Sequence, residues 1–290
     1  MKGRPLVEIL CEGNDRVGYG HIRRSLTLAA RLERDGMDVR IQGLSEEASR
    51  WLSVPMFAGR SAGIQIFDSP CAIDDRIREA HACGQVSVAL DWFGETVPDV
   101  NIAVYPHGEV RGTREVHVGF EYILIREEIA SFHGASATHG AKRVLVFLGG
   151  GDLLNQGHET ARQLSRQGLD VTLVQGPLAV NKDAGDGYRV LVNPTDLPQL
   201  LAASDWAVTN GGGCLFEAMC MGKAAFVLPQ TEAEMKIARF AEERGAVLGI
   251  GLGGLREFDC KELGAIAERG ANLVDGRGAS RVSSIVRNLI

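Results

Sequence analysis

The chain has 290 residues, of which 45% are hydrophobic and 23% are charged, and it carries a net charge of −6 at pH 7. A chain of this length and composition forms one large α/β domain or two globular domains of ordinary size. The negative net charge argues against nucleic acid or an anionic membrane as the main partner.

The first half of the chain alternates between short apolar strands and amphipathic helices. A strand over residues 5–13 leads into a glycine-containing loop and then into a helix that begins at His21 and ends before Gly36. Apolar residues in that helix recur at helical spacing, which predicts one core-facing side. The further elements expected in this half are strands at 37–44, 62–69, 85–92 and 100–106 and a helix at 72–84. This alternation is typical of βαβ units and predicts a mostly parallel sheet with helices on both faces.

The segment "SFHGASATHGAK", residues 131–142, has no apolar period and interrupts the alternation. Its small residues make it a candidate linker, in which His133 and His139 are expected to be solvated loop residues. We therefore predict an N-terminal domain over residues 1–135 and a C-terminal domain over residues 142–290.

The second half repeats the same alternation of elements. Its expected strands are 142–148, 169–176, 188–193, 205–209 and 223–230, and its expected helices are 154–168, 195–204, 214–222, 232–245, 258–270 and 279–290. Two Rossmann-like domains of this kind leave a cleft between them, which is the usual place for a ligand. The six cysteines show no CxxC spacing and no histidine at metal-ligand spacing, so we expect reduced thiols and no bound metal.

His21 stands at the end of "VGYGH", directly before the first predicted helix. Gly18 and Gly20 permit tight turns and the close approach of a ligand. The dipole at a helix start helps to keep an imidazole neutral, which suits a general base, and Arg24 one turn later acts in the same direction. The alternative is that His21 only caps the loop and packs, and the spacing alone does not decide between the two.

A first glycine-rich turn, "FLGGGD", follows a predicted strand of the second half. The backbone N–H groups of Gly150 and Gly151 form a potential anion site, because such groups are unpaired at a strand–helix turn. Asp152 equally suits the cap of the next helix. A glycine turn after a parallel strand is common, so this motif is weak when taken alone.

The second turn, "TNGGG", is part of the most specific motif in the chain. It runs from Asn210 through three glycines into a helix, and its free N–H groups can hold a diphosphate without any lysine. Glu217 follows about one turn into that helix, where a carboxylate can accept two hydrogen bonds from a ribose diol. The alternative is that Glu217 pairs with a nearby basic residue.

Acidic residues follow two predicted strands of the first half. Asp91 ends the strand in "VALDWF" and would point from the carboxyl edge of the sheet into the cleft, unless it is only a turn residue. Glu12 and Asp15 precede or lie in the first glycine-containing loop, and both are alternatively simple surface acids.

The segments "GYGHIRRSLTLAARL", "LDWF", "VGFEYILIREEI", "FLGGGD" and "NGGGCLFEAMCMGKAAFVLP" together resemble the nucleotide-sugar hydrolase family of pseudaminic acid biosynthesis. The spore-coat polysaccharide proteins of that family look similar. The resemblance covers nearly the whole chain, and its motifs occur in the family order. It implies a GT-B-like α/β fold of two Rossmann-like domains, a UDP-linked amino-deoxy sugar as substrate, and no metal or other cofactor.

The resemblance also implies roles for individual residues. His21 matches the family histidine and would activate a water that displaces UDP at the anomeric carbon, with Glu12 and Asp91 as further catalytic residues. Nucleotide binding falls to the C-terminal domain, with Glu217 on the ribose hydroxyls and glycines on the diphosphate. We assign the nucleotide to Gly150, Gly151, Asn210, Gly211, Gly212, Gly213 and Glu217, and the sugar to Gly20, Arg24 and Phe93.

The chain departs from the family pattern mainly on the sugar side. Glu12 stands where the family usually has Asp, and Phe93 stands where it usually has Tyr. Glu234 and Met235 replace an Asn-Gln pair, and the usual acidic segment between 93 and 110 is not evident. These changes suggest a different sugar, or an acceptor other than water.

The sequence therefore predicts a monomeric UDP-sugar hydrolase whose partner is a small nucleotide-sugar. The N-terminal apolar run is too short for a signal peptide and no segment approaches transmembrane length, so we expect a cytoplasmic protein without membrane insertion. The alternative is a GT-B glycosyltransferase that uses the same base on a hydroxyl acceptor. A third hypothesis, of another class, is a catalytically silent protein that binds sugar nucleotides.

Overall fold

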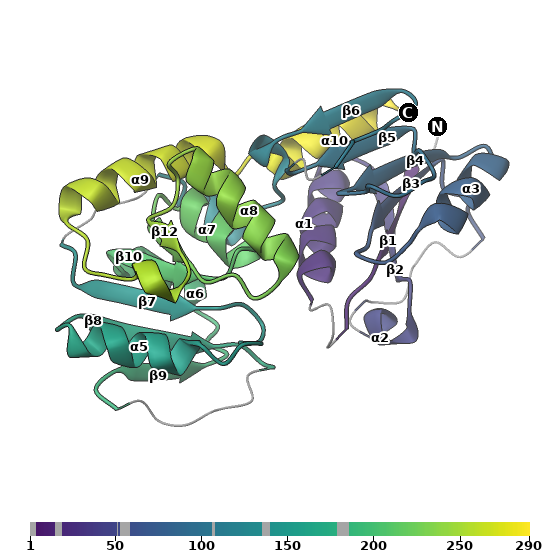
Figure 1. Ribbon diagram of the computed structural model, residues 1–290. Coiled ribbons are helices and arrows are strands. Elements are labelled where there is room, and N and C mark those ends of the chain that lie inside the picture. Colours follow the sequence, from purple (N-terminus) through teal and green to yellow (C-terminus); the bar gives the residue numbers. More distant parts are fainter. Residues whose placement is uncertain are drawn as a thin grey trace. The chain divides into compact units, whose positions relative to one another are not determined.

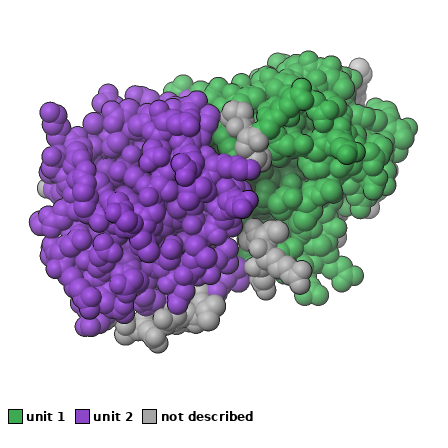
Figure 2. Space-filling model, in the orientation of Figure 1, with its two compact units in different colours: residues 1–126, 277–290 green, residues 127–276 purple. Residues whose placement is uncertain are grey.

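The chain forms two compact units (Figure 2). The computed structural model describes residues 4–14, 19–50, 52, 59–105, 108–134, 140–178 and 186–290. Asp15, Gly18 and His139 lie outside this part of the chain. Unit 1 comprises residues 1–126 and 277–290, and unit 2 comprises residues 127–276.

Unit 1 is built on a parallel sheet (Figure 1). Among the described residues this sheet has six strands in the order β2-β1-β3-β4-β5-β6, with every pair parallel. The strands are β1 (Leu6–Cys11), β2 (Asp38–Gly43), β3 (Ile64–Asp68), β4 (Val86–Leu90), β5 (Val100–Ala103) and β6 (Glu115–Val118). The helices are α1 (Gly20–Arg34), α2 (Glu46–Ser49), α3 (Asp74–Ala82) and α10 (Gly278–Asn288), with the 3-10 turn η1 (Phe120–Tyr122). The sequence did not predict α2 or β6, which are short and have little apolar pattern.

Unit 2 repeats this architecture with a second parallel sheet (Figure 1). Its described residues form six strands in the order β12-β11-β10-β7-β8-β9. The strands are β7 (Arg143–Phe147), β8 (Asp170–Gln175), β9 (Arg189–Val192), β10 (Trp206–Thr209), β11 (Ala224–Val227) and β12 (Gly249–Ile250). The helical elements are α4 (Glu127–Ala130), α5 (Gly157–Arg166), α6 (Leu197–Ala203), α7 (Gly213–Cys220), α8 (Glu232–Glu243), η2 (Leu252–Gly254) and α9 (Cys260–Leu273).

The central strands of both sheets are mostly or wholly buried. All four residues of β10, and all four of β11, are buried. A parallel strand is covered by helices on both faces, so its sequence reads as a continuous apolar run instead of an alternating one. This explains why the short runs "WAVT" and "AAFV" predicted β10 and β11, whereas the two-residue strand β12 was not predicted.

The last helix, α10, belongs to unit 1, which corrects the predicted C-terminal domain of residues 142–290. It packs on α1 and η1. Val282 and Val286 are fully buried in the same apolar cluster as Leu28 and Leu32 of α1. The amphipathic pattern of α10 showed that one side is covered, but the pattern carries no information about which sheet covers it.

The other boundary also lies earlier than the predicted linker. Unit 2 begins at residue 127, and the first part of the 131–142 segment is attached to it. The backbone N–H of Gly134 and Nδ1 of His133 both contact the carbonyl oxygen of Cys220, at 3.3 Å and 3.0 Å. His133 is exposed, as expected of a loop residue, but its ring is bonded to the chain.

Each sheet contains one point where the strand order reverses. In unit 1, β1 has β2 on one side and β3 on the other, and in unit 2, β7 has β8 on one side and β10 on the other. Loops at the carboxyl ends of the strands diverge at such a point, which makes it the usual ligand site of an open α/β sheet. The functional residues of this chain are therefore expected at these two edges.

Replacing Val286 by Ala should lower the free energy of unfolding of unit 1 by about 1–3 kcal/mol, because a fully buried side chain loses packing and burial. Hydrogen exchange followed by mass spectrometry should show faster exchange in the strands of unit 1 and unchanged exchange in unit 2. Ile290→Ala is the matched control, since Ile290 is 62% exposed and surface changes cost little. Faster exchange in the strands of unit 2 instead would contradict the assignment of α10 to unit 1.

Candidate functional site

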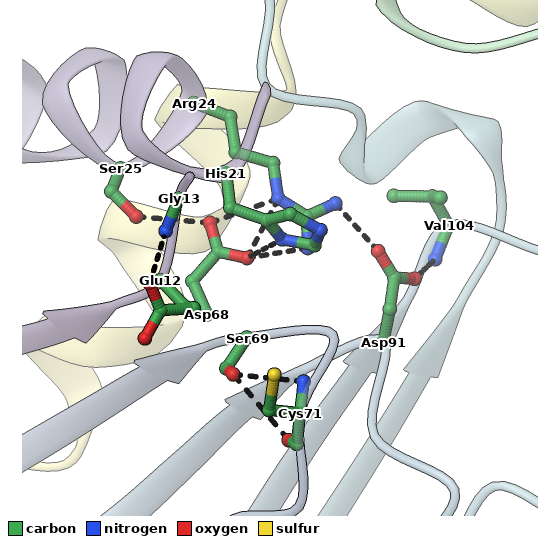
Figure 3. Close-up of polar contacts among 10 residues, drawn as sticks. All are labelled: Glu12, Gly13, His21, Arg24, Ser25, Asp68, Ser69, Cys71, Asp91 and Val104. Carbon is green, nitrogen blue, oxygen red and sulfur yellow. Dashed lines mark hydrogen bonds and ion pairs between the residues drawn. The ribbon is translucent and has the colours of Figure 1, made fainter. Parts of the chain in front are cut away.

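A network of charged side chains lies at the carboxyl edge of the unit 1 sheet (Figure 3). Asp68 is the last residue of β3, Asp91 follows the last residue of β4, and His21 and Arg24 lie in the first two turns of α1. Since β1, β3 and β4 are parallel neighbours, the ends of β3 and β4 lie next to the start of the helix that follows β1. The topology therefore gathers four residues that are up to 70 positions apart in the chain.

His21 is bonded to Asp68 (Figure 3). Its Nδ1 lies 2.6 Å from Oδ1 of Asp68. The Asp68 side chain is 0% exposed, whereas the His21 side chain keeps 24% of its surface exposed. Ser25, one turn after His21, donates its hydroxyl to the second carboxylate oxygen of Asp68 at 2.9 Å. The imidazole is thus attached through one nitrogen to a buried acid, while the side chain keeps access to solvent.

Arg24 lies between the two aspartates. Its Nε is 2.9 Å from both carboxylate oxygens of Asp68, and its Nη2 is 2.6 Å from Oδ1. Its Nη1 is 2.6 Å from Oδ2 of Asp91. Burial alone raises the pKa of Asp68, but the charge and hydrogen bonds of Arg24 and His21 outweigh it and hold that pKa well below the usual carboxyl range. Asp68 is therefore ionised at neutral pH.

Asp91 is fixed by the backbone as well as by Arg24. Its Oδ1 accepts the N–H of Val104 at 2.8 Å, and its own N–H donates to the carbonyl of Ile102 at 2.9 Å. Its φ of 53° lies in the left-handed region, which Asp tolerates better than most residues because its side chain can bond locally. Both oxygens of Asp91 are occupied by groups of the chain itself.

The other residues assigned to the unit 1 site are less closely connected to His21. Glu12 is 6% exposed, and its Oε1 accepts the N–H of Gly13 and the hydroxyl of Ser45, both at 2.8 Å. Phe93 borders a small pocket together with Trp92 and Arg111. Gly20 is the first residue of α1, and a Cβ added there would meet nothing within 4 Å.

One side chain bonded to His21 was not identified from the sequence. Asp68 was not singled out, although "IQIFDS" ends an apolar run in an acid just as "VALDWF" does at Asp91. The same signal applied to every predicted strand would have found it. Cys11 is fully buried, and burial raises the pKa of its thiol to about 12, so it is a core residue and not a nucleophile.

The two glycine turns of unit 2 lie at the point where its strand order reverses. Gly149 has a φ of 87°, and a Cβ there would lie 3.1 Å from Nδ2 of Asn210. A Cβ on Gly211 would lie 2.3 Å from the backbone oxygen of Glu234. These two glycines are needed because segments of the chain approach each other closely. Gly150 and Gly213 face open space, so close approach of a ligand remains possible there.

Glu234, which the sequence noted only as a departure, occupies the second glycine turn. Its carboxylate accepts Nδ2 of Asn210 at 2.6 Å, the N–H of Gln230 at 2.7 Å and the N–H of Gly211 at 3.3 Å. Burial raises the pKa of Glu234, and these hydrogen bonds only partly oppose the rise. Asn210 and Gly211 therefore already bond an acid of the chain, although both were predicted to hold a nucleotide.

Asp152 and Glu217 take different positions relative to their helices. Asp152 accepts the N–H groups of Gln156 and Gly157 at 2.9 Å and 2.6 Å, so it satisfies unpaired donors at the start of α5. These two bonds support the helix-capping role that the sequence suggested for Asp152. Glu217 lies one turn into α7 and is half-buried.

Within the described ranges, no group of three His, Cys, Asp or Glu side chains is arranged to hold a metal ion. In the same ranges, no helix combines the length and the apolar character needed to cross a membrane.

Comparison with known sequences finds one curated relative. No family model matches the chain. Over 218 residues it is 27% identical to the spore coat polysaccharide biosynthesis protein SpsG of Bacillus subtilis (strain 168). The match covers 66% of this chain and 62% of that protein, so the chain spans less than two thirds of the relative's length.

Solved structures resemble the chain over nearly its whole length. MurG of Acinetobacter baumannii superposes with a TM-score of 0.70 at 14% identity, covering 98% of this chain and 99% of that chain. A glycotransferase of kitacinnamycin gives 0.68 at 17% identity, covering 99% of each chain. MnaA of S. aureus, solved with UDP, gives 0.61 at 11% identity, covering 99% of this chain and 98% of that one. These likenesses confirm the expected GT-B-like α/β fold with two parallel sheets.

Replacing Arg24 by Met should lower the free energy of unfolding by about 3–5 kcal/mol at pH 7, because it leaves the buried Asp68 carboxylate without its main cation. The pKa of Asp68 is depressed in the folded protein, so the network stabilises the fold above about pH 4 and the stabilisation is lost as the pH falls further. In the variant, Asp68 takes up a proton at a higher pH than in the wild type. The difference in free energy of unfolding between the two proteins should therefore narrow as the pH falls toward about 4.

Chemical denaturation between pH 4 and pH 8 measures this difference directly. Arg23→Met is the matched control, because Arg23 is the exposed neighbour of Arg24 on the same helix. A loss of stability equal in the two variants, or one that does not vary with pH, would contradict the assigned ion pair.

Proposed function

We propose that this chain is an enzyme acting on a nucleotide-activated sugar, with UDP as the nucleotide. Three findings support the proposal: the fold shared with glycosyltransferase structures, the UDP bound in the similar structure of MnaA, and the polysaccharide biosynthesis named for the curated relative. We assign nucleotide binding to unit 2 and the reactive base to unit 1, each on the chemistry of its own residues.

The observation that carries the proposal is the state of His21. Its Nδ1 contacts a buried acid that is held ionised, and the side chain remains partly exposed. An imidazole attached through Nδ1 offers Nε2 as the atom that accepts a proton. A partly exposed imidazole with one nitrogen fixed is the common arrangement of a general base.

The reaction we propose is hydrolysis at the anomeric carbon. Nε2 of His21 takes a proton from a water molecule as the water oxygen bonds to the anomeric carbon. The bond from that carbon to the diphosphate oxygen breaks, and UDP leaves with the bonding electrons. The proton on His21 then returns to solvent, so the products are free sugar, UDP and one proton.

For the nucleotide, the proposal uses the glycine turns and α7 of unit 2. The open space around Gly150 and Gly213 supports an approach of the diphosphate to their backbone N–H groups. Glu217 on α7 remains the proposed acceptor for the ribose hydroxyls. Glu234 already bonds the amide of Asn210 and the N–H of Gly211, so an anion at this turn would compete with that carboxylate.

Glycosyl transfer to a hydroxyl acceptor is the second candidate, and it is favoured by the glycosyltransferases among the structural neighbours. The same base would then deprotonate a hydroxyl of the acceptor instead of water. The two candidates differ only in what the base activates, so an assay without acceptor separates them.

Incubation with UDP-, CMP- and GDP-sugars in ¹⁸O-water, followed by mass spectrometry, should release UDP and a sugar carrying the label. His21→Ala should lower the rate by about 10²–10⁴-fold while UDP still binds, because general-base catalysis contributes on that scale. His81→Ala, in unit 1 but bonded only to Ser87 and Asp99, should keep the wild-type rate.

UDP binding without sugar release from any donor would favour the transferase. Turnover by His21→Ala at the wild-type rate would remove His21 from the mechanism. Binding without turnover of any donor–acceptor pair would leave a catalytically silent binding protein.

A second variant tests the nucleotide side. Glu217→Ala should weaken UDP binding by about 1–3 kcal/mol, the scale of a lost hydrogen bond to a charged group. Isothermal titration calorimetry measures this, with Glu243→Ala on the exposed side of α8 as the control. Unchanged affinity in Glu217→Ala would show that this carboxylate does not contact the ribose.

A further inference from the structure

We propose that Asp68 is the positioning residue of the site: it fixes His21 in the tautomer with the proton on Nδ1 and so makes Nε2 the base, while Arg24 and Asp91 serve to hold Asp68. The catalytic consequence of this inference rests on the proposed function, whereas the tautomer of His21 is assigned from the hydrogen bond alone. It replaces the expected arrangement, in which Asp91 acted beside His21 and Arg24 bound the sugar.

The direction of the His21–Asp68 hydrogen bond follows from charge. An ionised carboxylate only accepts hydrogen bonds, so the nitrogen 2.6 Å from its oxygen must be the donor. The other donors around Asp68, the guanidinium of Arg24 and the hydroxyl of Ser25, keep the carboxylate in that state. A neutral His21 with its proton on Nδ1 has a lone pair on Nε2 and no other nitrogen that can act as base.

Arg24 is held mainly by the two aspartates. Each of its three guanidinium nitrogens bonds a carboxylate oxygen of Asp68 or Asp91. A ligand that drew the guanidinium away from these acids would leave the buried Asp68 carboxylate without its cation, which is costly. The geometry therefore favours a supporting role for Arg24 over a role in ligand binding.

Asp91 completes the chain of contacts. It bonds Nη1 of Arg24 and is itself held by the backbone of Val104. The structure shows no bond from Asp91 to His21 among the described contacts, so any effect of Asp91 on the base passes through Arg24 and Asp68. Glu12, Asp68 and Asp91 are the three acids considered at this edge. Of these three, Asp68 is the one whose described contacts include the imidazole of His21.

The first test reads the tautomer in the wild-type protein. With ¹⁵N-labelled histidine, two-bond proton–nitrogen correlation spectra distinguish a ring protonated on Nδ1 from one protonated on Nε2, and His21→Gln identifies the signal among seven histidines. At pH 8 His21 should be protonated on Nδ1. A ring protonated on Nε2 overturns the proposal, and this result depends on no variant of Asp68 being able to fold.

The second test replaces the acid. Asp68→Asn should lower kcat by about 10²–10⁴-fold with KM changed less than about threefold, because the base is misoriented but no substrate contact is lost. The His21 signal should at the same time shift toward protonation on Nε2. Asp99→Asn is the control, since Asp99 is a half-buried acid of unit 1 that accepts hydrogen bonds from Ser87, and it should change neither quantity.

The outcomes separate this inference from the proposed function. Wild-type kcat in Asp68→Asn, or loss through KM alone, overturns the positioning role. If the wild type has the Nδ1-protonated ring but turns over no sugar nucleotide with or without acceptor, the proposed function is wrong and the assignment of the His21 tautomer to Asp68 stands.

Discussion

The ion pair between the buried Asp68 and Arg24 is the constraint on which the edge of unit 1 depends. A carboxylate without access to solvent costs several kcal/mol unless a cation and hydrogen-bond donors surround it. Arg24 meets this need only when α1 begins over the carboxyl ends of β3 and β4. His21, Ser25, Leu28 and Leu32 then follow one another along one side of the helix. The polar half of that side meets the acid, and the apolar half enters the core.

Unit 2 stabilises a buried acid in a different way. Glu234 has no cation among its bonded partners and instead accepts hydrogen bonds from an amide and two backbone N–H groups. Neutral donors offset burial less than a full positive charge does, which is why the pKa of Glu234 is raised whereas that of Asp68 is lowered. The side chain of Glu234, ionised or neutral, thus already occupies part of the glycine turn that is proposed to receive an anionic ligand.

The sequence anticipated the elements better than it anticipated their partners. Apolar runs bounded by glycine identified the buried strands, and helical spacing identified α1. His21, Arg24 and Asp91 were each singled out, and the structure brings them into one network. Asp68 was missed because an acid after an apolar run looks the same whether it ends a strand at the surface or is buried under a helix. Gly211 was predicted to contact the nucleotide, although chain packing alone requires a glycine there.

What the sequence by itself determined is the local pattern: which segments are strands, which are helices with one covered side, and that two parallel α/β units follow one another. Those properties depend on neighbours within a few residues, so periodicity and turn residues are sufficient. Only the tertiary structure decided that α10 returns to unit 1, that Glu234 fills the glycine turn, and that Asp68 rather than Asp91 contacts His21. Each of these pairs residues far apart in the chain, and the order of parallel strands, which no local pattern encodes, determines which strand ends meet.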